Sequence, residues 1–218
     1  MSATPFEHNS MPPPGLCTAV VLAGGAGRRM DGRDKGLLPW HGTTMAGHAA
    51  ARLAALGLPV LISANRNLDE YQAYGHPLLQ DRRPDYAGPL AAIEAALLAA
   101  PTPWVLTVPC DSPFFPDDLP ARLWVALHAG TTGAGAARAD AAYVRCGAQS
   151  HPVFSLVATR LAAPLGRYLE DGGRRVHDWW QAAGALSVDF GSAAADNFAN
   201  ANTADELARL RGRDQRSG

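Results

Sequence analysis

The first half of the chain alternates short apolar runs with segments of helical composition, and this order leaves few folds open to it. The apolar runs lack a polar face, as is typical of strands buried on both sides of a sheet. They lie at residues 17–23, 59–63, 76–81 and 103–111. The helical segments lie between them, at residues 44–57, 68–75 and 88–100. Strands joined by helices pair in parallel through right-handed crossovers. The order therefore predicts a mostly parallel, Rossmann-like α/β sheet with helices on both faces.

The second half of the chain is less regular. Residues 141–147 and 151–157 have the composition of paired strands, which makes part of the sheet antiparallel. Further helices are expected at residues 157–173, 174–184 and 203–212. Without an internal repeat or a linker, one domain is expected over residues 16–211. The remaining residues, 1–15 and 212–218, have the composition of flexible tails.

Composition restricts the class of protein. The net charge is −1, and hydrophobic residues make up 47% of the 218 residues. This balance is typical of a globular domain and argues against general binding to nucleic acid or membrane surfaces. Cys17, Cys110 and Cys146 form no CxxC motif, which fits a reducing compartment, and no apolar run approaches the roughly 18 residues of a membrane span. We therefore expect a cytoplasmic protein whose partners include neither nucleic acid nor membrane.

The ends of the four predicted strands carry small or polar residues. Gly24 and Gly25 follow the first strand, while Ser63, Asp81 and Asp111 end the other three. Ligands of open α/β sheets bind beyond the carboxyl ends of the strands. The sequence therefore predicts that these residues converge at an active site on one edge of the sheet.

The segment after the first strand combines glycines with positive charge. It differs from the dinucleotide pattern GxGxxG because Met30 stands where the last glycine is required, and it lacks the Lys-Ser/Thr pair of a Walker A loop. What remains is a glycine turn followed by Arg28, Arg29 and Lys35. Glycines let backbone N–H groups approach phosphate oxygens, and arginine and lysine supply charge-assisted donors. A triphosphate-binding loop is predicted; the alternative is a tight turn with solvated charges.

Residues 22–38, LAGGAGRRMDGRDKGLL, resemble the signature LAGGxxxRMGGxDKGLL of the molybdenum cofactor guanylyltransferases. Further blocks resemble this family in the family's order, at residues 64–67, 80–93, 108–119, 151–156, 168–176 and 198–207. The resemblance implies a nucleotidyltransferase fold and the joining of GTP to molybdenum-carrying molybdopterin. Pyrophosphate and a guanine dinucleotide cofactor would be the products. It also implies contacts with molybdopterin insertion proteins and with molybdoenzyme apoproteins.

The resemblance implies which residues bind each substrate. For GTP they are Leu22, Ala23, Gly24, Gly25, Arg28, Lys35, Ser63, Asp81 and Asp111. For molybdopterin they are His151, Asn200 and Asn202.

The chemistry of nucleotidyl transfer leads to an overlapping set. The terminal phosphate of molybdopterin would attack the α-phosphorus of GTP in line. Its second pKa is about 6, so it is largely ionised at neutral pH and needs no general base. Catalysis then depends on neutralising and positioning two anions. Arg29, Lys35 and Asp111 are the candidate catalytic residues, with Asp111 as the ligand of Mg²⁺.

Three of these residues have structural alternatives. Asp111 could be an N-cap or turn aspartate, Asp81 could cap the segment that follows it, and Asn202 could cap the last helix. Two positions depart from the family pattern: Asp31 replaces a glycine, and Ser63 stands where some members have an asparagine near the nucleotide.

Other functions remain open from the sequence. Relatives that use CTP typically have Leu-Ala-Ala-Gly where this chain has Leu-Ala-Gly-Gly at residues 22–25, which favours guanine. The alternatives are a cytidylyltransferase or a sugar-phosphate nucleotidyltransferase of the same fold, and a non-catalytic carrier of nucleotide or molybdopterin. The presence of both Lys35 and Asp111 argues against a carrier, because binding alone does not require a metal carboxylate.

Overall fold

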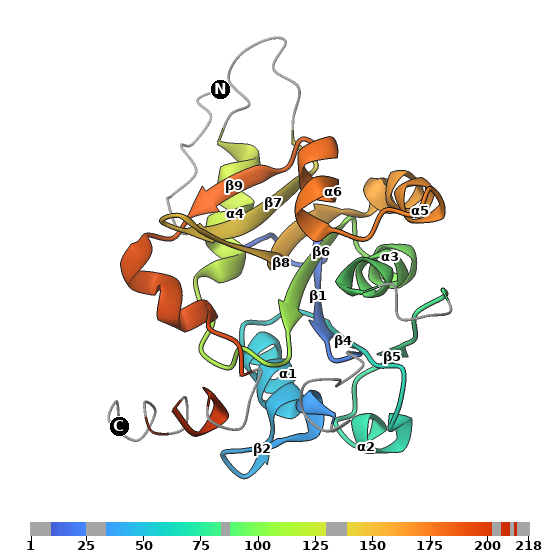
Figure 1. Cartoon of the computed structure of the whole chain (residues 1–218). Helices are drawn as coiled ribbons and strands as arrows, with labels where there is room; N and C mark the ends of the chain where they lie inside the picture. The colour runs from blue at the N-terminus through green and yellow to red at the C-terminus, as the bar shows by residue number, and fades with distance from the viewer. Residues whose placement is uncertain are drawn as a thin grey trace.

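A computed structural model describes residues 10–24, 34–83, 88–129, 139–201, 206–209 and 212. Within these residues, the main sheet has seven strands in the order β5-β4-β1-β6-β8-β7-β9 (Figure 1). The strands are β1 (Cys17–Leu22), β4 (Val60–Ser63), β5 (Leu78–Leu79), β6 (Trp104–Pro109), β7 (Ala141–Cys146), β8 (Gln149–Ala158) and β9 (Leu186–Asp189). A separate hairpin pairs β2 (Pro39–Trp40) with β3 (Thr43–Thr44).

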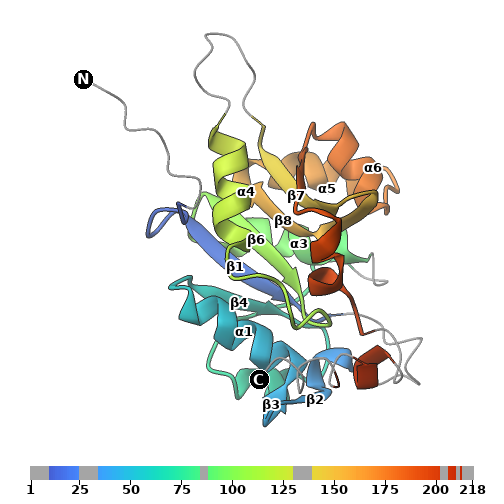
Figure 2. The ribbon, with the colours of Figure 1, turned by 90° about the vertical axis from the view of Figure 1, so that its left-hand side faces the viewer.

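Helices cover both faces of the main sheet (Figure 2). On one face lie α1 (Met45–Ala55) and α4 (Leu119–His128). On the other lie α3 (Pro89–Ala99), α5 (Ala162–Glu170) and α6 (Val176–Ala182). The short helix α2 (Leu68–Gln72) follows β4. Three 3₁₀ helices complete the described elements: η1 (Lys35–Leu37), η2 (Thr159–Leu161) and η3 (Ser192–Phe198).

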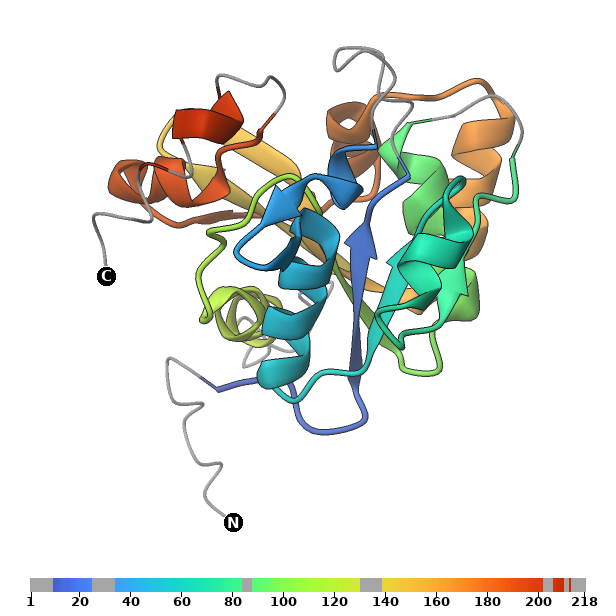
Figure 3. The ribbon, with the colours of Figure 1, turned by 90° about the horizontal axis from the view of Figure 1, so that it is seen from below.

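The strand pairing confirms the predicted mixed sheet. β1 pairs in parallel with β4 on one side and with β6 on the other, and β4 pairs in parallel with β5. β8 runs antiparallel to both β6 and β7, and β9 is parallel to β7. The carboxyl ends of β5, β4, β1 and β6 therefore lie in a row at one edge. The segment with η1 and the hairpin packs on α1 at this edge (Figure 3).

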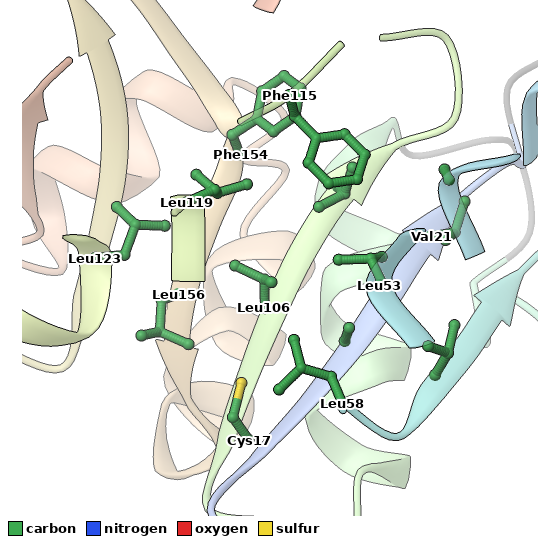
Figure 4. Packing of buried hydrophobic residues seen from close by; sticks show 14 of the residues in the cluster. Cys17, Val21, Leu53, Leu58, Leu106, Phe115, Leu119, Leu123, Phe154 and Leu156 are labelled. Atoms are coloured by element: carbon green, nitrogen blue, oxygen red, sulfur yellow. The ribbon is translucent and has the colours of Figure 1, made fainter. Parts of the chain in front are cut away.

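The larger hydrophobic core fills the space between the sheet and the α1–α4 face (Figure 4). Leu106 of β6 is fully buried there, with Leu53 of α1 to one side and Leu156 of β8 to the other. Full burial of one such leucine stabilises the fold by about 1.5–3 kcal/mol. Apolar packing on both faces thus holds the strands in place. The strand ends lie outside this packing and can carry polar residues.

Several predicted elements differ in extent from those found. β5 contains only Leu78–Leu79, so Asp81 follows the strand and does not end it. The helix expected from residue 157 begins at Ala162, because Val157 still pairs with Val105 in the sheet. In the predicted helix at residues 203–212, residues 206–209 and 212 are helical and the others lie outside the described residues. Most of the predicted tails, residues 1–9 and 213–218, also lie outside them.

Two main elements were not predicted, α4 and β9. α4 carries the apolar residues Leu119, Leu123 and Leu127 at a spacing of four, but the segment before it is rich in Pro and Asp and reads as a loop. β9 is four residues long and largely exposed, so it lacks the apolar run of a buried strand. Among the described residues, no helix combines the length and the apolar character needed to cross a bilayer.

Candidate active site

The structure brings the strand-end residues together at one edge of the sheet. Leu22 is opposite Ser63 on β4 and Pro109 on β6, so Ala23 and Gly24 continue between the ends of these two strands. Asp81 and Asp111 each come two residues after their own strands, β5 and β6. This row of residues was predicted from the sequence. Gly25, Arg28, Arg29 and Asn202, and the departing residue Asp31, lie outside the described residues.

Lys35 and Asp111 form an ion pair across the end of β1. The Lys35 Nζ atom lies 3.2 Å from Asp111 Oδ2, and the two side chains are 21% and 14% exposed. Gly36, the next residue, packs against Ala23, since a Cβ at Gly36 would lie 3.2 Å from the Ala23 Cβ atom. Burial raises the pKa of Asp111, and the charge and hydrogen bond of Lys35 oppose that rise. The edge thus holds a desolvated carboxylate beside a cation.

Asp111 and Asp81 do not cap the helices that follow them. α4 has Asp118 at its N-cap position, and α3 has Gly88. Neither aspartate is therefore the N-cap of the next helix, but Asp111 does lie in a turn, which is the other half of its structural alternative.

Asn65 holds Asp81 through two hydrogen bonds. Its Nδ2 atom donates to Asp81 Oδ2 at 2.8 Å, and its Oδ1 atom accepts from the Asp81 backbone N–H at 2.8 Å. Asp81 Oδ1 is buried and has no hydrogen-bond partner within the described residues. Burial raises the pKa of Asp81, while the bond from Asn65 opposes the rise. Asp81 therefore presents one unsatisfied carboxylate oxygen at the sheet edge.

The same Asn65 amide limits which residue can stand at position 24. A Cβ at Gly24 would lie 2.9 Å from Asn65 Nδ2, closer than ordinary van der Waals contact. Glycine at this position leaves room for the Asn65 side chain. Sequence reasoning did not single out Asn65, although the residue lies in the block at residues 64–67 and two positions past a strand end.

Ser63 is fully buried, and its hydroxyl has no partner within the described residues. Alternation along β4 places it on the α3 face with Leu61, whereas Ile62 packs on the α1 face. An unsatisfied buried hydroxyl costs free energy, which a hydrogen bond to a bound ligand would offset.

The C-terminal part of the domain is tied to the Asp111 segment. The Ser112 hydroxyl lies 2.6 Å from Asn200 Oδ1, and the Ala201 N–H donates to the Asp111 carbonyl at 2.8 Å. Asn200 therefore lies beside the segment that carries the predicted metal ligand, Asp111. Its neighbour Phe198 packs against the His151 ring, with the ring centroids 5.4 Å apart.

His151 lies near the start of β8, beyond the point where β6 ends. It is buried, and its Nε2 atom has no hydrogen-bond partner within the described residues. Burial lowers the pKa of His151, which favours the neutral imidazole. His151 and Asn200, two of the three predicted molybdopterin residues, are thus on the β8 side of Asp111.

The described residues contain no group of three or more His, Cys, Asp or Glu side chains arranged to hold a metal ion. Mg²⁺ in phosphoryl-transfer sites usually has only one or two protein carboxylates, with water and phosphate oxygens as the other ligands. The partly buried Asp111 carboxylate fits this pattern.

Comparison with known proteins identifies the family. A model of the MobA-like NTP transferase domain matches residues 19–184. The chain belongs to this family. A molybdenum cofactor guanylyltransferase of Methylibium petroleiphilum is 46% identical over 194 residues, which cover 88% of this chain and 94% of that protein.

Solved structures show the same fold at low identity. Molybdopterin-guanine dinucleotide biosynthesis protein A from Archaeoglobus fulgidus superposes with a TM-score of 0.72 at 19% identity, covering 92% of this chain and all 100% of that one. A CMP:2-keto-3-deoxy-manno-octonic acid synthetase solved with CTP gives a TM-score of 0.71 at 11% identity, covering 93% and 100%. The MobA-like fold is thus common to proteins named for different nucleotides, so base choice must come from individual residues.

Proposed function

We propose that this protein transfers GMP from GTP to the terminal phosphate of molybdenum-carrying molybdopterin. The products are molybdopterin guanine dinucleotide and pyrophosphate. The observation that carries the proposal is the Lys35–Asp111 pair over the end of β1, in a chain 46% identical to a molybdenum cofactor guanylyltransferase. A carboxylate and an ammonium group at one strand edge suit a reaction between two phosphates.

Lys35 supplies positive charge to the triphosphate. Its Nζ atom is within hydrogen-bond distance of Asp111, and its side chain is 21% exposed, so it can also reach a ligand at the edge. An ammonium at this place lowers the repulsion between attacking and leaving phosphates. Arg28 and Arg29 add donors for the same oxygens in this proposal.

Asp111 is the residue proposed to hold Mg²⁺. A bound Mg²⁺ neutralises phosphate oxygens and the charge that develops on the leaving pyrophosphate. The Asp111 carboxylate is partly buried, its pKa is raised and Lys35 lies beside it, which supports a site whose charge balance is completed by a ligand. Asp81, whose Oδ1 atom has no hydrogen-bond partner among the described residues, faces the nucleotide in the proposal.

Guanine is proposed to bind near Leu22, Ala23, Gly24 and Ser63. Backbone groups after β1 and the unsatisfied Ser63 hydroxyl can pair with a base edge. Molybdopterin would lie on the β8 side, near His151 and Asn200, with Asn202 completing this set. We propose that the reaction takes place in the cytoplasm and that the product passes to molybdopterin insertion proteins or to molybdoenzyme apoproteins.

The direct test supplies molybdopterin, Mg²⁺ and one nucleoside triphosphate at a time to the purified protein, and measures pyrophosphate release. GTP should exceed CTP and ATP in kcat/KM by at least about a hundredfold, because a site built to pair one base leaves buried groups unpaired with another. Equal or better use of CTP would move the protein to the cytidylyltransferases. Nucleotide binding without any pyrophosphate release would favour a carrier.

The metal assignment has its own test. Asp111→Asn should lower kcat by at least about a hundredfold at saturating Mg²⁺, because a charge-neutralising ion is lost from the transition state. The matched control is Asp117→Asn, which changes an exposed aspartate of the same segment that pairs with Arg52. Near-normal turnover of Asp111→Asn would refute the metal role, provided that circular dichroism shows both variants folded.

A further inference from the structure

Asp34 is a buried carboxylate that gathers donors from two separate segments. Its Oδ1 atom accepts hydrogen bonds from the Gly36 N–H at 3.1 Å and from the Tyr71 hydroxyl at 2.7 Å. Its Oδ2 atom accepts from Asn67 Nδ2 at 3.0 Å and lies 3.5 Å from Arg66 Nε. Two of the three hydrogen-bond donors, together with the Arg66 guanidinium, come from the segment that joins β4 to α2 and from α2 itself.

These contacts fix the turn that carries Lys35. Asp34 is the N-cap of η1, and the bond from Gly36 closes a loop around Lys35. The other donors anchor this turn on the β4 side of β1. Lys35 then reaches over the end of β1 to Asp111 on the β6 side. The direction of the ammonium group therefore depends on how Asp34 is held.

Tyr71 is the most enclosed of the side-chain donors to Asp34. It is 0% exposed, and a Cβ at Gly36 would overlap its hydroxyl, so the turn and the phenol are in close contact. Burial raises the pKa of Tyr71, and the bond to Asp34 adds to the rise. The phenol therefore keeps its proton and remains a donor at neutral pH.

We propose that Tyr71 is a positioning residue for the transfer reaction, acting through Asp34 to aim Lys35 at the triphosphate. The inference rests on the proposed role of Lys35 as a phosphate ligand. It assigns α2 a part in substrate binding although α2 contributes no residue to the predicted GTP set. Loss of the hydroxyl leaves Asp34 with its other donors, so the fold should survive while the turn becomes less well fixed.

The test measures GTP binding in the presence of Mg²⁺ by isothermal titration calorimetry. Tyr71→Phe should raise the Kd for GTP about tenfold. This is the scale of one lost hydrogen bond to a charged group, here the Asp34 carboxylate that positions Lys35. Asn67→Gly should raise it in the same direction, because it removes the amide donor while glycine accepts the φ of 52° at this residue.

Tyr74→Phe is the matched control. Tyr74 follows α2, and its hydroxyl is hydrogen-bonded at 2.5 Å to Thr44, the N-cap of α1, with no bond to Asp34 among the described contacts. This variant also loses one tyrosine hydrogen bond, but it should change the Kd less than about twofold. Melting temperatures without ligand measure how far each variant is destabilised.

The double variant Lys35→Ala/Tyr71→Phe separates positioning from general stability. If Tyr71 acts through Lys35, its substitution should change the Kd less than about twofold once Lys35 is absent. An equal loss in both backgrounds, or equal losses for Tyr71→Phe and Tyr74→Phe, would overturn the inference and leave the Lys35 assignment intact. Unchanged GTP affinity in Lys35→Ala alone would refute the phosphate role of Lys35, and the inference with it.

Discussion

A single methyl group added at Gly24 would affect the site through the neighbouring Asn65 side chain. An added Cβ would lie 2.9 Å from Asn65 Nδ2, and that atom already donates to Asp81 at 2.8 Å. Asn65 can move away only by giving up the bond to Asp81. We therefore expect Gly24→Ala to weaken GTP binding about tenfold, the scale of one lost hydrogen bond to a carboxylate. Calorimetric titration with GTP and Mg²⁺ measures the effect.

The control for this prediction is Asn65→Ala, alone and combined with Gly24→Ala. Once the Asn65 amide is absent, the methyl group at residue 24 meets no obstacle there, and the second substitution should cost little more. If Gly24→Ala weakens binding equally in both backgrounds, the methyl group acts directly on the nucleotide, as expected from a close approach of the backbone to the purine.

At the residue scale, the sequence predicted positions better than contacts. Lys35 and Asp111 could be found because a motif and a strand end each mark them, and the sheet order brings them to 3.2 Å. Asn65 and Tyr71 could not be ranked in the same way. Their importance comes from which side chain they meet, Asp81 and Asp34, and such pairings depend on backbone geometry that residue types do not encode.

Among the elements, the segment after β5 is fastened to two helices. The Arg83 guanidinium donates to both carboxylate oxygens of Glu94 on α3 at 2.7 Å, and to the Gly166 carbonyl on α5 at 3.1 Å. The Glu94 side chain is only 7% exposed. These bonds hold the chain at Arg83, two residues beyond Asp81. Asn65 holds the same segment at Asp81, so the segment is fixed at both points.

Breaking the Arg83–Glu94 ion pair should destabilise the whole domain. Glu94→Gln replaces one acceptor by an amide donor beside a partly buried guanidinium, and we expect the free energy of unfolding to fall by about 1–3 kcal/mol. Glu170→Gln is the control, because Glu170 is 65% exposed and lies 3.4 Å from Arg83, farther than Glu94 does. Such an exposed ion pair contributes less than about 1 kcal/mol. Urea denaturation of both variants measures the difference, and equal midpoints would show that the Arg83–Glu94 pair is not a structural anchor.

Element prediction succeeded where periodicity was strong. β1, α1, β6 and α3 were found within two residues of their observed limits, because buried strands and Ala/Leu-rich helices leave clear patterns. β5 was predicted too long at both ends, because a sequence pattern does not show that only Leu78 and Leu79 pair with the neighbouring strand. α4 and β9 were missed because one begins within a Pro- and Asp-rich segment and the other is mostly exposed.

For the molecule as a whole, the antiparallel strands extend the sheet beyond the nucleotide-binding half. β8, β7 and β9 continue from β6, and the segment with η3 returns from them to the Asp111 turn through Asn200 and Ala201. The two halves therefore share one edge. In this arrangement His151, near the start of β8, is buried where the two halves meet. Its protonation therefore affects the free energy of unfolding of the entire fold.

Folding should become less favourable below neutral pH because of His151. The unfolded chain binds a proton at this residue with a pKa of about 6.5, whereas burial lowers the pKa of His151 in the folded protein. As the pH falls through 6.5, the unfolded state takes up a proton that the folded state refuses, and stability is lost until the folded pKa is reached. Between pH 7.5 and 5.5 this loss can reach at most about 1.4 kcal/mol, the limit for a histidine that stays unprotonated in the folded state.

The measurement is the free energy of unfolding in urea at pH 7.5 and pH 5.5, for the unmodified protein and for His151→Gln. The substitution removes the titrating group, so the difference in stability between the two pH values should shrink, whatever the substitution does to stability at pH 7.5. His177→Gln, at an exposed histidine of α6, controls for the loss of a histidine as such. If His151→Gln keeps the full pH dependence of the unmodified protein, His151 takes up its proton equally readily in the folded and unfolded states, and burial against Phe198 does not lower its pKa.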